Sequence, residues 1–349
     1  MVERPDRGFG RARQGSGGSG NRKCAVFVVN YHDDLNEVQG GAVPAPAPFD
    51  RIEWWRELAE HCGLVPLIAV ASDGDEHAVM PLQRTADGLA ALANWYNFTW
   101  QPVVTPGGMA VLTALVRDLA RQTARLSLSP LPDENGEAAR LDEAFRAAGW
   151  VTFRSQCDVN HVLPVAGRSY GEFLVGRPGQ LRTTLKRKAN KVVVAIETKF
   201  NSSSWAAYEA IYAESWKPGE GSPAFLRAFA KAEAQAGRLR LGLAYADGIP
   251  VAAQFWTVEN GTAYIHKLAH TEAAKPLSPG TTLSAALFEH VIDRDRVGLV
   301  DFGTGDDGYK RDWMEAVRPR YRLDCYRPGN PQNWPAIVRE RLRRMVARG

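Results

Sequence analysis

The sequence has no apolar run long enough to cross a membrane as a helix. Its longest apolar stretches, residues 24–29 and 64–71, have the length of buried strands, whereas a spanning helix needs about 20 residues. The N-terminus lacks the apolar stretch of a secretory signal, so we expect a cytoplasmic protein. The 349 residues predict two domains of roughly 150 residues each.

Cysteines are few, and the familiar catalytic and metal-binding motifs are missing. The four cysteines are far apart and never form a CxxC pair, which argues against a zinc site or a disulfide scaffold. The chain contains no P-loop, no HExxH, no nucleophile elbow and no nicotinamide-binding fingerprint. The sequence therefore offers no motif for a metal site or for covalent catalysis.

The net charge of +4 is carried by the two ends of the chain. Residues 1–23 hold six basic and two acidic side chains, and residues 334–349 hold five arginines and one glutamate, so each end carries +4 and the body −4. This distribution does not indicate a general nucleic-acid-binding protein. Residues 1–23 are also rich in Gly and Ser, and we expect a disordered basic tail there.

The two halves of the chain repeat one order of expected elements. Each half reads as an aromatic-rich helix, a three-stranded meander, a Pro-Gly loop, a helix, a short apolar strand, an acidic pair, a further helix and a final strand. The counterparts lie 173 or 174 residues apart: the turns at Asp73 and Asp247, the loops at 105–107 and 278–280, and the acidic pairs at 133–134 and 306–307.

This order of elements predicts an α/β fold with a mixed sheet, present as two tandem domains. The third meander strand of each half, expected at residues 88–96 and 262–269, leads through a helix to a parallel strand, which is a βαβ crossover. Sheets of this kind bind ligands at the carboxyl ends of their strands, beside a helix N-terminus.

The strongest candidate for a binding site is the loop at residues 277–282. Ser278, Pro279 and Gly280 precede a helix, and the amides of Gly280, Thr281 and Thr282 would point at an anion such as a pyrophosphate. Ser-Pro-Gly before a helix is also an ordinary N-terminal cap, so the loop alone does not establish an anion-binding site.

The region around this loop resembles the GNAT acetyltransferase superfamily, specifically its Fem-like branch and the CelD/BcsL-type acetyltransferases linked to cellulose biosynthesis. The residues that carry the resemblance are Ser278-Pro279-Gly280, Asp301-Phe302-Gly303, and Tyr309-Lys310 followed by Trp313. The two repeated halves of the chain also agree with this resemblance, since Fem-like proteins carry two GNAT-type domains. The resemblance covers residues 24–328.

The resemblance implies direct acyl transfer from acetyl-CoA or another acyl-CoA to an amine or hydroxyl, without a metal and without a covalent enzyme intermediate. Tyr309 would protonate the departing thiolate or pack beneath the loop, and Asp301 would orient or deprotonate the acceptor or brace a loop. The edge of the strand at residues 264–269 would supply an N–H to the carbonyl oxygen. Ser278, Gly280, Thr281, Thr282 and Lys310 would contact the donor, although Lys310 also reads as a surface lysine.

His266 and Lys267 are adjacent on one expected strand, so they should face opposite sides of the sheet. One of them must then point to the cleft, where a histidine could act as base through a water; a hydrogen-bonded core histidine is the alternative. The general base is left open between Asp301, His266 and bulk water. In the first half the positions matching Tyr309 and Lys310 are Gly136 and Glu137, so we expect the second half to catalyse.

Two further basic segments have two interpretations each. Residues 177–191 predict a basic helix that either attracts an anionic substrate (a CoA phosphate, a nucleotide-sugar or a tRNA) or is a solvated face. No aromatic pattern for specific RNA recognition accompanies it. Residues 334–349 predict an amphipathic basic helix that either docks on anionic lipid at the inner face of the membrane or packs on its own domain.

We therefore expect a disordered tail at 1–23, an N-terminal GNAT-like domain at 24–160 that shapes the acceptor side, a catalytic domain at 161–333 and a C-terminal helix at 334–349. The acceptor implied by the resemblance is a sugar, a polysaccharide precursor or a lipid-linked envelope intermediate. One alternative is a Fem-type ligase that uses aminoacyl-tRNA, which the basic helix favours. The other is a degenerate pair of GNAT domains that binds a biosynthetic partner without catalysis.

Overall fold

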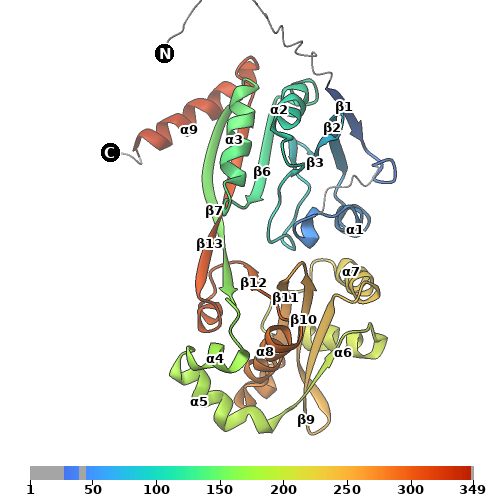
Figure 1. The fold of residues 1–349 in the computed structure, drawn as a ribbon, viewed down its shortest axis with the longest axis vertical. Helices are drawn as coiled ribbons and strands as arrows, with labels where there is room; N and C mark the ends of the chain where they lie inside the picture. Colours follow the sequence, from blue (N-terminus) through green and yellow to red (C-terminus); the bar gives the residue numbers. More distant parts are fainter. Residues whose placement is uncertain (1–26, 39–44, 347–349) are drawn as a thin grey trace, which may run out of the picture.

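The computed structural model describes residues 27–38 and 45–346, which form two lobes (Figure 1). The first lobe is built around a meander and three helices. Its elements are β1 (Val28–His32), α1 (Ile52–Cys62), β2 (Pro66–Asp73), β3 (Glu76–Thr85), β4 (Gly88–Ala91), β5 (Val103–Val104), α2 (Met109–Asp118), β6 (Arg125–Leu131) and α3 (Glu137–Ala147).

The second lobe repeats this order after two additional short helices. It contains α4 (Tyr170–Val175), α5 (Gly179–Lys188), β8 (Val193–Glu197), α6 (Ser202–Ala213), α7 (Pro223–Gln235), β9 (Leu239–Ala246), β10 (Ile249–Glu259), β11 (Thr262–His270), α8 (Pro279–Glu289) and β12 (Leu299–Thr304). A π-helical turn, His290–Arg294, extends α8. The expected βαβ crossovers are present, because β4 pairs in parallel with β6 and β11 with β12.

Two long strands, β7 (Val151–Pro164) and β13 (Ala316–Tyr326), join the lobes into one 13-stranded sheet. They pair with each other antiparallel along most of their length. Beyond this shared ladder β7 pairs with β12 of the second lobe, while β13 pairs with β6 of the first. The last strand of each half is therefore exchanged into the sheet of the other half (Figure 1). The boundary expected between residues 160 and 161 lies inside β7, and the division into domains stays a prediction.

The repeated turns of the two meanders confirm the tandem arrangement. The β2–β3 hairpin turns at Gly74, with φ +59°, and the β9–β10 hairpin turns at Asp247 and Gly248, with φ +49° and +77°. These left-handed conformations suit Gly and are tolerated by Asp, which explains the Asp-Gly dipeptide at the second turn. The fold is thus a mixed α/β fold of two repeated halves, as the sequence predicted.

Two expected elements differ in the structure. The third strand of the first meander ends at Ala91 and does not continue to Tyr96, because residues 92–102 leave the sheet and bury Tyr96 and Phe98 against the second lobe. The helix expected from Tyr309 is only a short 3-10 turn, Gly308–Asp312, after which the chain enters β13.

Aromatic side chains pack the lobes together. Trp54 of α1 contacts Phe225 and Phe229 of α7 edge-on, with ring centroids 5.0 and 4.9 Å apart. All three rings are buried, and truncating one such ring costs about 3–5 kcal/mol. The core that contains them draws on both halves of the chain, so the position of one lobe is fixed against the other.

Candidate active site

Strands β11 and β12 separate at the point where the lobes meet. They pair only through Thr262–Leu299, Ala263–Val300 and Tyr264–Asp301. Beyond Tyr264, β11 continues to His270 without β12 beside it. A bulge contributes to the divergence, because Phe255 and Trp256 of β10 face Lys267 and Ile265 and leave His266 between them. Such bulges bend a strand and increase its twist.

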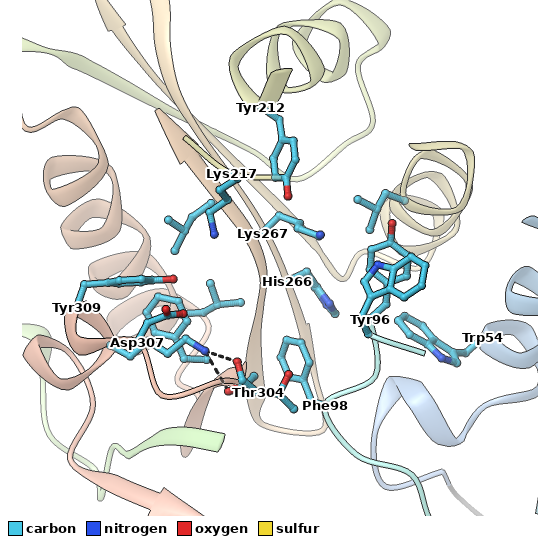
Figure 2. A pocket seen from close by; sticks show the side chains of 17 residues that line it. Trp54, Tyr96, Phe98, Tyr212, Lys217, His266, Lys267, Thr304, Asp307 and Tyr309 are labelled. Atoms are coloured by element: carbon cyan, nitrogen blue, oxygen red, sulfur yellow. Dashed lines mark hydrogen bonds between the residues drawn. The ribbon is translucent and has the colours of Figure 1, made fainter. Parts of the chain in front are cut away.

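A cavity of about 160 Å³ lies in this opening, between the lobes; we call it the interlobe pocket. Both lobes contribute aromatic walls, and the charged groups come from the second lobe (Figure 2). Its lining residues are Trp54, Trp95, Tyr96, Phe98, Tyr212, Lys217, Leu226, Ile265, His266, Lys267, Leu268, Phe302, Gly303, Thr304, Asp307, Tyr309 and Lys310.

A second cavity of about 500 Å³ runs along the start of α8; we call it the α8 groove. Its walls include Gly280, Thr281 and Ser284 of α8, with Trp216 and His270, whose tilted rings have centroids 4.4 Å apart. The groove and the interlobe pocket share Leu268, Phe302 and Tyr309. A molecule bound in the groove would therefore meet a molecule bound in the pocket at these three side chains.

Tyr309 stands where the two cavities meet. Its ring packs edge-on against Phe302, with centroids 5.7 Å apart, and 38% of its surface is exposed to the two openings. Burial, with a smaller contribution from Asp307, raises the pKa of Tyr309 above its ordinary value. The phenol is therefore protonated at neutral pH and can donate a proton to an atom at the junction. Figure 2 shows its hydroxyl pointing into the same space as the ammonium of Lys217.

The predicted loop forms the N-terminus of α8. Ser278 is its N-cap with φ +55°, and the first helical bond runs from the Thr282 amide to the Ser278 carbonyl at 3.3 Å. The amides of Gly280 and Thr281 precede that bond and have no acceptor within the helix. Gly280 and Thr281 line the α8 groove, whereas Ser278 and the buried Thr282 do not.

The basic helix α5 lies beside this N-terminus. The Lys188 ammonium donates to the Ser278 hydroxyl at 3.1 Å, which brings a positive charge to the start of α8. Arg177 is instead structural: it is buried, pairs with Glu315 and donates to the Trp313 carbonyl at 3.2 Å. The remaining basic side chains of the cluster are exposed: Arg182, Lys186, Arg187 and Lys191.

His266 has the surroundings of a core histidine. Its Nε2 lies 2.8 Å from the hydroxyl of the fully buried Thr257, and aromatic rings surround it, among them Phe255 at 5.1 Å and Phe98 at 5.4 Å. Burial, reinforced by Lys267, lowers the pKa of His266 to about 3. The ring is neutral at physiological pH and already bonded, so this geometry favours the structural interpretation of His266 over the catalytic one.

The expectation that His266 and Lys267 face opposite sides of the sheet is wrong. Both residues line the interlobe pocket, because the bulge at His266 interrupts the alternation of side chains along β11. Lys267 pairs with Glu220 at 2.9 Å, and its ammonium lies 4.8 Å from the centre of the Tyr96 ring. Glu220 also accepts a hydrogen bond from the Tyr96 hydroxyl, which links the cluster to the first lobe.

Lys310 is buried and is not the surface lysine that its position on an expected helix indicated. Only 3% of it is exposed, and its ammonium donates to the carbonyls of Gly303, Thr304 and Gly305. An ammonium has three N–H donors, and all three are used here. Lys310 therefore holds the loop after β12 in shape, although it also forms part of the pocket wall.

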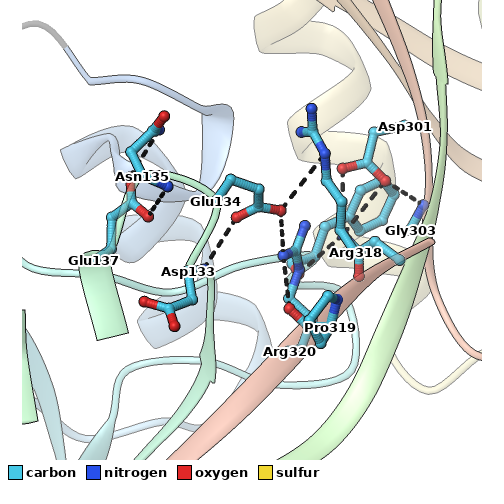
Figure 3. A network of polar contacts seen from close by, with 11 residues as sticks. Asp133, Glu134, Asn135, Glu137, Asp301, Gly303, Arg318, Pro319 and Arg320 are labelled. Carbon is cyan, nitrogen blue, oxygen red and sulfur yellow. Dashed lines mark hydrogen bonds and ion pairs between the residues drawn. The ribbon is translucent and has the colours of Figure 1, made fainter. Parts of the chain in front are cut away.

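Asp301 lies outside both cavities. It is 5% exposed, its carboxylate accepts from the Gly303 amide at 2.8 Å, and the Asn160 side chain donates to it at 3.2 Å. Burial raises its pKa, while the nearby Arg320 opposes the increase. These contacts join β12 to β7, as expected of a carboxylate that braces a loop (Figure 3).

Sequence reasoning did not identify Lys217 as a site residue. It follows α6, lines the pocket, and has a pKa lowered first by burial and then by Lys267. Its ammonium forms no hydrogen bond or ion pair with the residues that the structure describes. Across the pocket lies Asp307, whose carboxylate belongs to the predicted acidic pair. No sequence motif marks Lys217, because the residues whose charges lie near it, Lys267 and Asp307, are distant in the sequence.

The matching region of the first lobe is filled by its own chain. Strands β4 and β6 pair through Leu89–Leu126 and Ala90–Ser127 before they separate. Trp100 is inserted there: its amide donates to the Pro130 carbonyl at 2.7 Å and its indole to the Pro81 carbonyl at 2.8 Å. The opening between β4 and β6 is thus occupied by a buried side chain, whereas the opening between β11 and β12 holds the interlobe pocket.

Comparisons with known proteins agree with this architecture. Residues 176–311 match the family described as the acetyltransferase (GNAT) domain. No curated protein matches the chain. Among solved structures, FemX is similar over 81% of this chain and 93% of its own, with a TM-score of 0.60 and 10% identity. These values establish a common fold.

Two further solved structures share the arrangement of both lobes. L-PGS from Bacillus licheniformis covers 87% of this chain and 98% of its own, with a TM-score of 0.52 and 13% identity. A tandem GNAT protein from the clavulanic acid biosynthesis pathway covers 85% and 98%, with a TM-score of 0.50 and 15% identity. The chain therefore has the tandem GNAT fold, and residues 176–311 of its second half match the acetyltransferase (GNAT) domain family.

The described residues contain no helix of the length and apolarity required to span a bilayer. Within the same residues, no group of three or more His, Cys, Asp or Glu side chains is arranged to hold a metal ion.

Proposed function

We propose that the protein is an acyltransferase that carries an acyl group from acyl-CoA, bound in the α8 groove, to an amine or hydroxyl in the interlobe pocket. The observation that carries the proposal is the junction of the two cavities at Leu268, Phe302 and Tyr309. Transfer by direct attack requires donor and acceptor to meet at one point, and proximity of this kind contributes a large part of the rate.

The donor would bind with its phosphates at the start of α8. The amides of Gly280 and Thr281 supply hydrogen bonds, the helix N-terminus favours negative charge, and Lys188 adds a cation on the Ser278 side. The exposed basic side chains of α5, such as Lys186 and Arg187, would attract the polyanion at longer range.

The chemical step would use Tyr309 and the unpaired part of β11. As the acceptor attacks the thioester carbonyl, negative charge develops on the oxygen, and amides of β11 beyond Tyr264 are available to it because β12 does not pair there. The sulfur then leaves as a thiolate and takes its proton from the Tyr309 hydroxyl. Asp307 is the carboxylate of the pocket wall and would take the acceptor's proton, directly or through a water.

The first lobe would shape the acceptor side. It contributes Trp54, Trp95, Tyr96 and Phe98 to the pocket, and aromatic faces of this kind favour the apolar face of a sugar ring or another flat group. A sugar, a polysaccharide precursor or a lipid-linked intermediate is the acceptor implied by the resemblance to CelD/BcsL-type proteins. Lys217, whose ammonium lies 5.6 Å from the centre of the Trp216 ring and forms no hydrogen bond or ion pair among the described residues, would bind a negative group of that acceptor.

A Fem-type ligase using aminoacyl-tRNA is the second candidate. The observation in its favour is the exposed basic face of α5 beside the groove, made by Arg182, Lys186, Arg187 and Lys191. The structural similarity to FemX concerns the fold and does not decide the donor.

Calorimetric titration of the purified protein with acetyl-CoA tests the proposal. We expect micromolar binding that Gly280→Trp abolishes, because an added Cβ at Gly280 already lies 3.4 Å from the His270 ring and an indole would fill the groove. Gly329→Trp is the matched control, since that glycine has nothing within 4 Å of its added Cβ. If the folded protein binds aminoacyl-tRNA but no acyl-CoA, the second candidate function replaces the first. If it binds neither, the two lobes form a non-catalytic pair of domains.

A further inference from the structure

The C-terminal helix α9 (Trp334–Val346) attaches to the first lobe by one narrow face. Ile337, 7% exposed, packs with Phe153 and Tyr326 in a small separate cluster. The Arg344 guanidinium lies 4.9 Å from the centre of the Phe153 ring and donates to the Arg154 carbonyl at 2.9 Å. These contacts fix the helix on the ends of β7 and β13, where it projects from the molecule (Figure 1).

A second face of α9, about 100° around the helix from Ile337, is apolar and exposed. Trp334, Val338, Leu342 and Met345 are 57%, 54%, 53% and 61% exposed. Their spacing of four, four and three residues places them on one side of a helix with 3.6 residues per turn. An open groove of about 570 Å³ runs along this side, lined by Pro335, Val338, Arg339, Leu342, Arg343 and Val346. We call the four exposed side chains Trp334, Val338, Leu342 and Met345 the outer stripe.

Arginines flank the outer stripe on both edges. At 100° per residue, Arg341 lies beside Trp334 and Met345, while Arg339 and Arg343 lie beyond Leu342 on the other edge. All three are exposed, and the helix has only one acidic residue, Glu340, which pairs with Arg343 at 2.9 Å. An apolar sector bordered by arginines, with a tryptophan in it, is the arrangement that binds in the interface of an anionic bilayer.

We infer that α9 docks the protein on an anionic lipid surface through the outer stripe. A second copy of the chain is a poorer occupant, because two stripes placed face to face would also bring the flanking arginines of both copies together. The stripe lies on the first lobe, and the α8 groove on the second, so a docked molecule would keep the groove accessible (Figure 1). This inference does not depend on the acyltransferase proposal.

Cosedimentation of the full chain with lipid vesicles tests the inference. We expect binding to vesicles of 30% phosphatidylglycerol in phosphatidylcholine and none to pure phosphatidylcholine. Leu342→Asp should abolish binding, while Ile249→Asp, which adds the same charge at an exposed apolar residue of β10, should leave it unchanged. Removing two arginines by Arg339→Gln and Arg341→Gln should weaken binding about 25-fold, at about fivefold for each residue near the surface.

A pair of matched charge changes separates docking from general attraction. Lys186→Gln with Arg187→Gln removes the same charge from α5 and should have a much smaller effect than the changes in α9. Equal effects of the two pairs, or binding that survives deletion of residues 334–349, would overturn the inference. The inference would also be overturned if the protein did not bind the anionic vesicles and instead formed a dimer, seen in sedimentation velocity, that Leu342→Asp dissociates.

Discussion

The guanidinium of Arg320 lies 2.6 Å from the carboxylate of Glu134, although 186 residues separate them in the sequence. Arg320 is on β13 and only 1% exposed, while Glu134 follows β6 in the first lobe. Asp306, of the matching acidic pair in the second lobe, lies 2.9 Å from His161 on β7 (Figure 3 shows the contact between Arg320 and Glu134). Each predicted acidic pair thus contacts the strand that comes from the other half.

Removing one partner of this pair should destabilise the whole molecule. Glu134→Ala leaves the buried Arg320 guanidinium without its carboxylate, and an uncompensated buried charge costs about 3–5 kcal/mol. We expect the urea midpoint to fall accordingly, with one cooperative transition for both lobes. Glu340→Ala is the control, because its pair with Arg343 is exposed and should contribute less than about 1 kcal/mol. Equal losses in the two variants would contradict this prediction.

Replacing Tyr309 by Phe should slow catalysis with little effect on donor binding. The phenol supplies the proton for the leaving thiolate, and a positioned acid of this kind contributes at least about 100-fold. Stopped-flow or thiol-reagent assays of CoA release give kcat, and calorimetry gives the Kd for the donor. Because burial keeps the pKa of Tyr309 above its ordinary value, the protonated, active form should persist to pH 10 and be lost only as the pH rises further. Tyr321→Phe is the control, and unchanged kcat in Tyr309→Phe would remove this role.

His266 should influence stability at acid pH and leave the pH profile of catalysis unaffected. Its pKa is about 3 in the folded protein against an ordinary value of 6.5, so the unfolded chain binds the proton more tightly. The contribution to stability is therefore complete above about pH 6.5 and decreases as the pH falls towards 3. At pH 5 the decrease is about 2 kcal/mol.

The measurement is the urea midpoint of the wild-type protein and of His266→Gln at pH 7.5 and pH 5. The substitution should lower stability at both pH values, since the ring packs among aromatic side chains, but the loss between the two pH values should be smaller in the variant. Rates that depend on a group of pKa near 6.5 in the wild-type enzyme, and not in the variant, would instead make His266 the general base.

Lys217→Gln should weaken acceptor binding selectively. The ammonium is half-buried in the interlobe pocket and points into the space beside Tyr309 (Figure 2). For an acceptor with a carboxylate or phosphate we expect KM to rise about tenfold, the equivalent of one charge-assisted hydrogen bond, with the Kd for the donor unchanged. Lys199→Gln is the control on the exposed surface. An acceptor whose KM does not respond carries no negative group at this position.

The sequence predicted the repeated elements better than their pairing. The 173-residue offset located both meanders, both crossovers and the loop at Ser278, because these features depend on local periodicity and turn residues. The exchange of β7 and β13 was not predictable, since no local pattern specifies which distant strand a final strand will join. The same limit applied to the pocket, where Tyr96, Lys217 and Lys267 come together from three separate segments.

The bulge at His266 shows a second limit. Strict alternation along a strand assigned His266 and Lys267 to opposite faces, and one extra residue in the ladder placed both in the pocket. Bulges of this kind depend on the neighbouring strand and have no reliable signal in one sequence. Lys310 was misjudged for a similar reason, because the carbonyls that bury it belong to the end of β12 and to the turn that follows it.

The strand exchange has a consequence for how such a chain could have originated. A polypeptide with one lobe only would leave the edge of its penultimate strand, equivalent to β6 or β12, without a neighbour. Two copies could satisfy each other by trading their last strands, which is a domain-swapped dimer with two-fold symmetry. The present chain would be the fused form of that dimer. Fusion then allowed one copy to fill the opening between β4 and β6 with Trp100 while the other kept the interlobe pocket between β11 and β12, a division that identical subunits could not make.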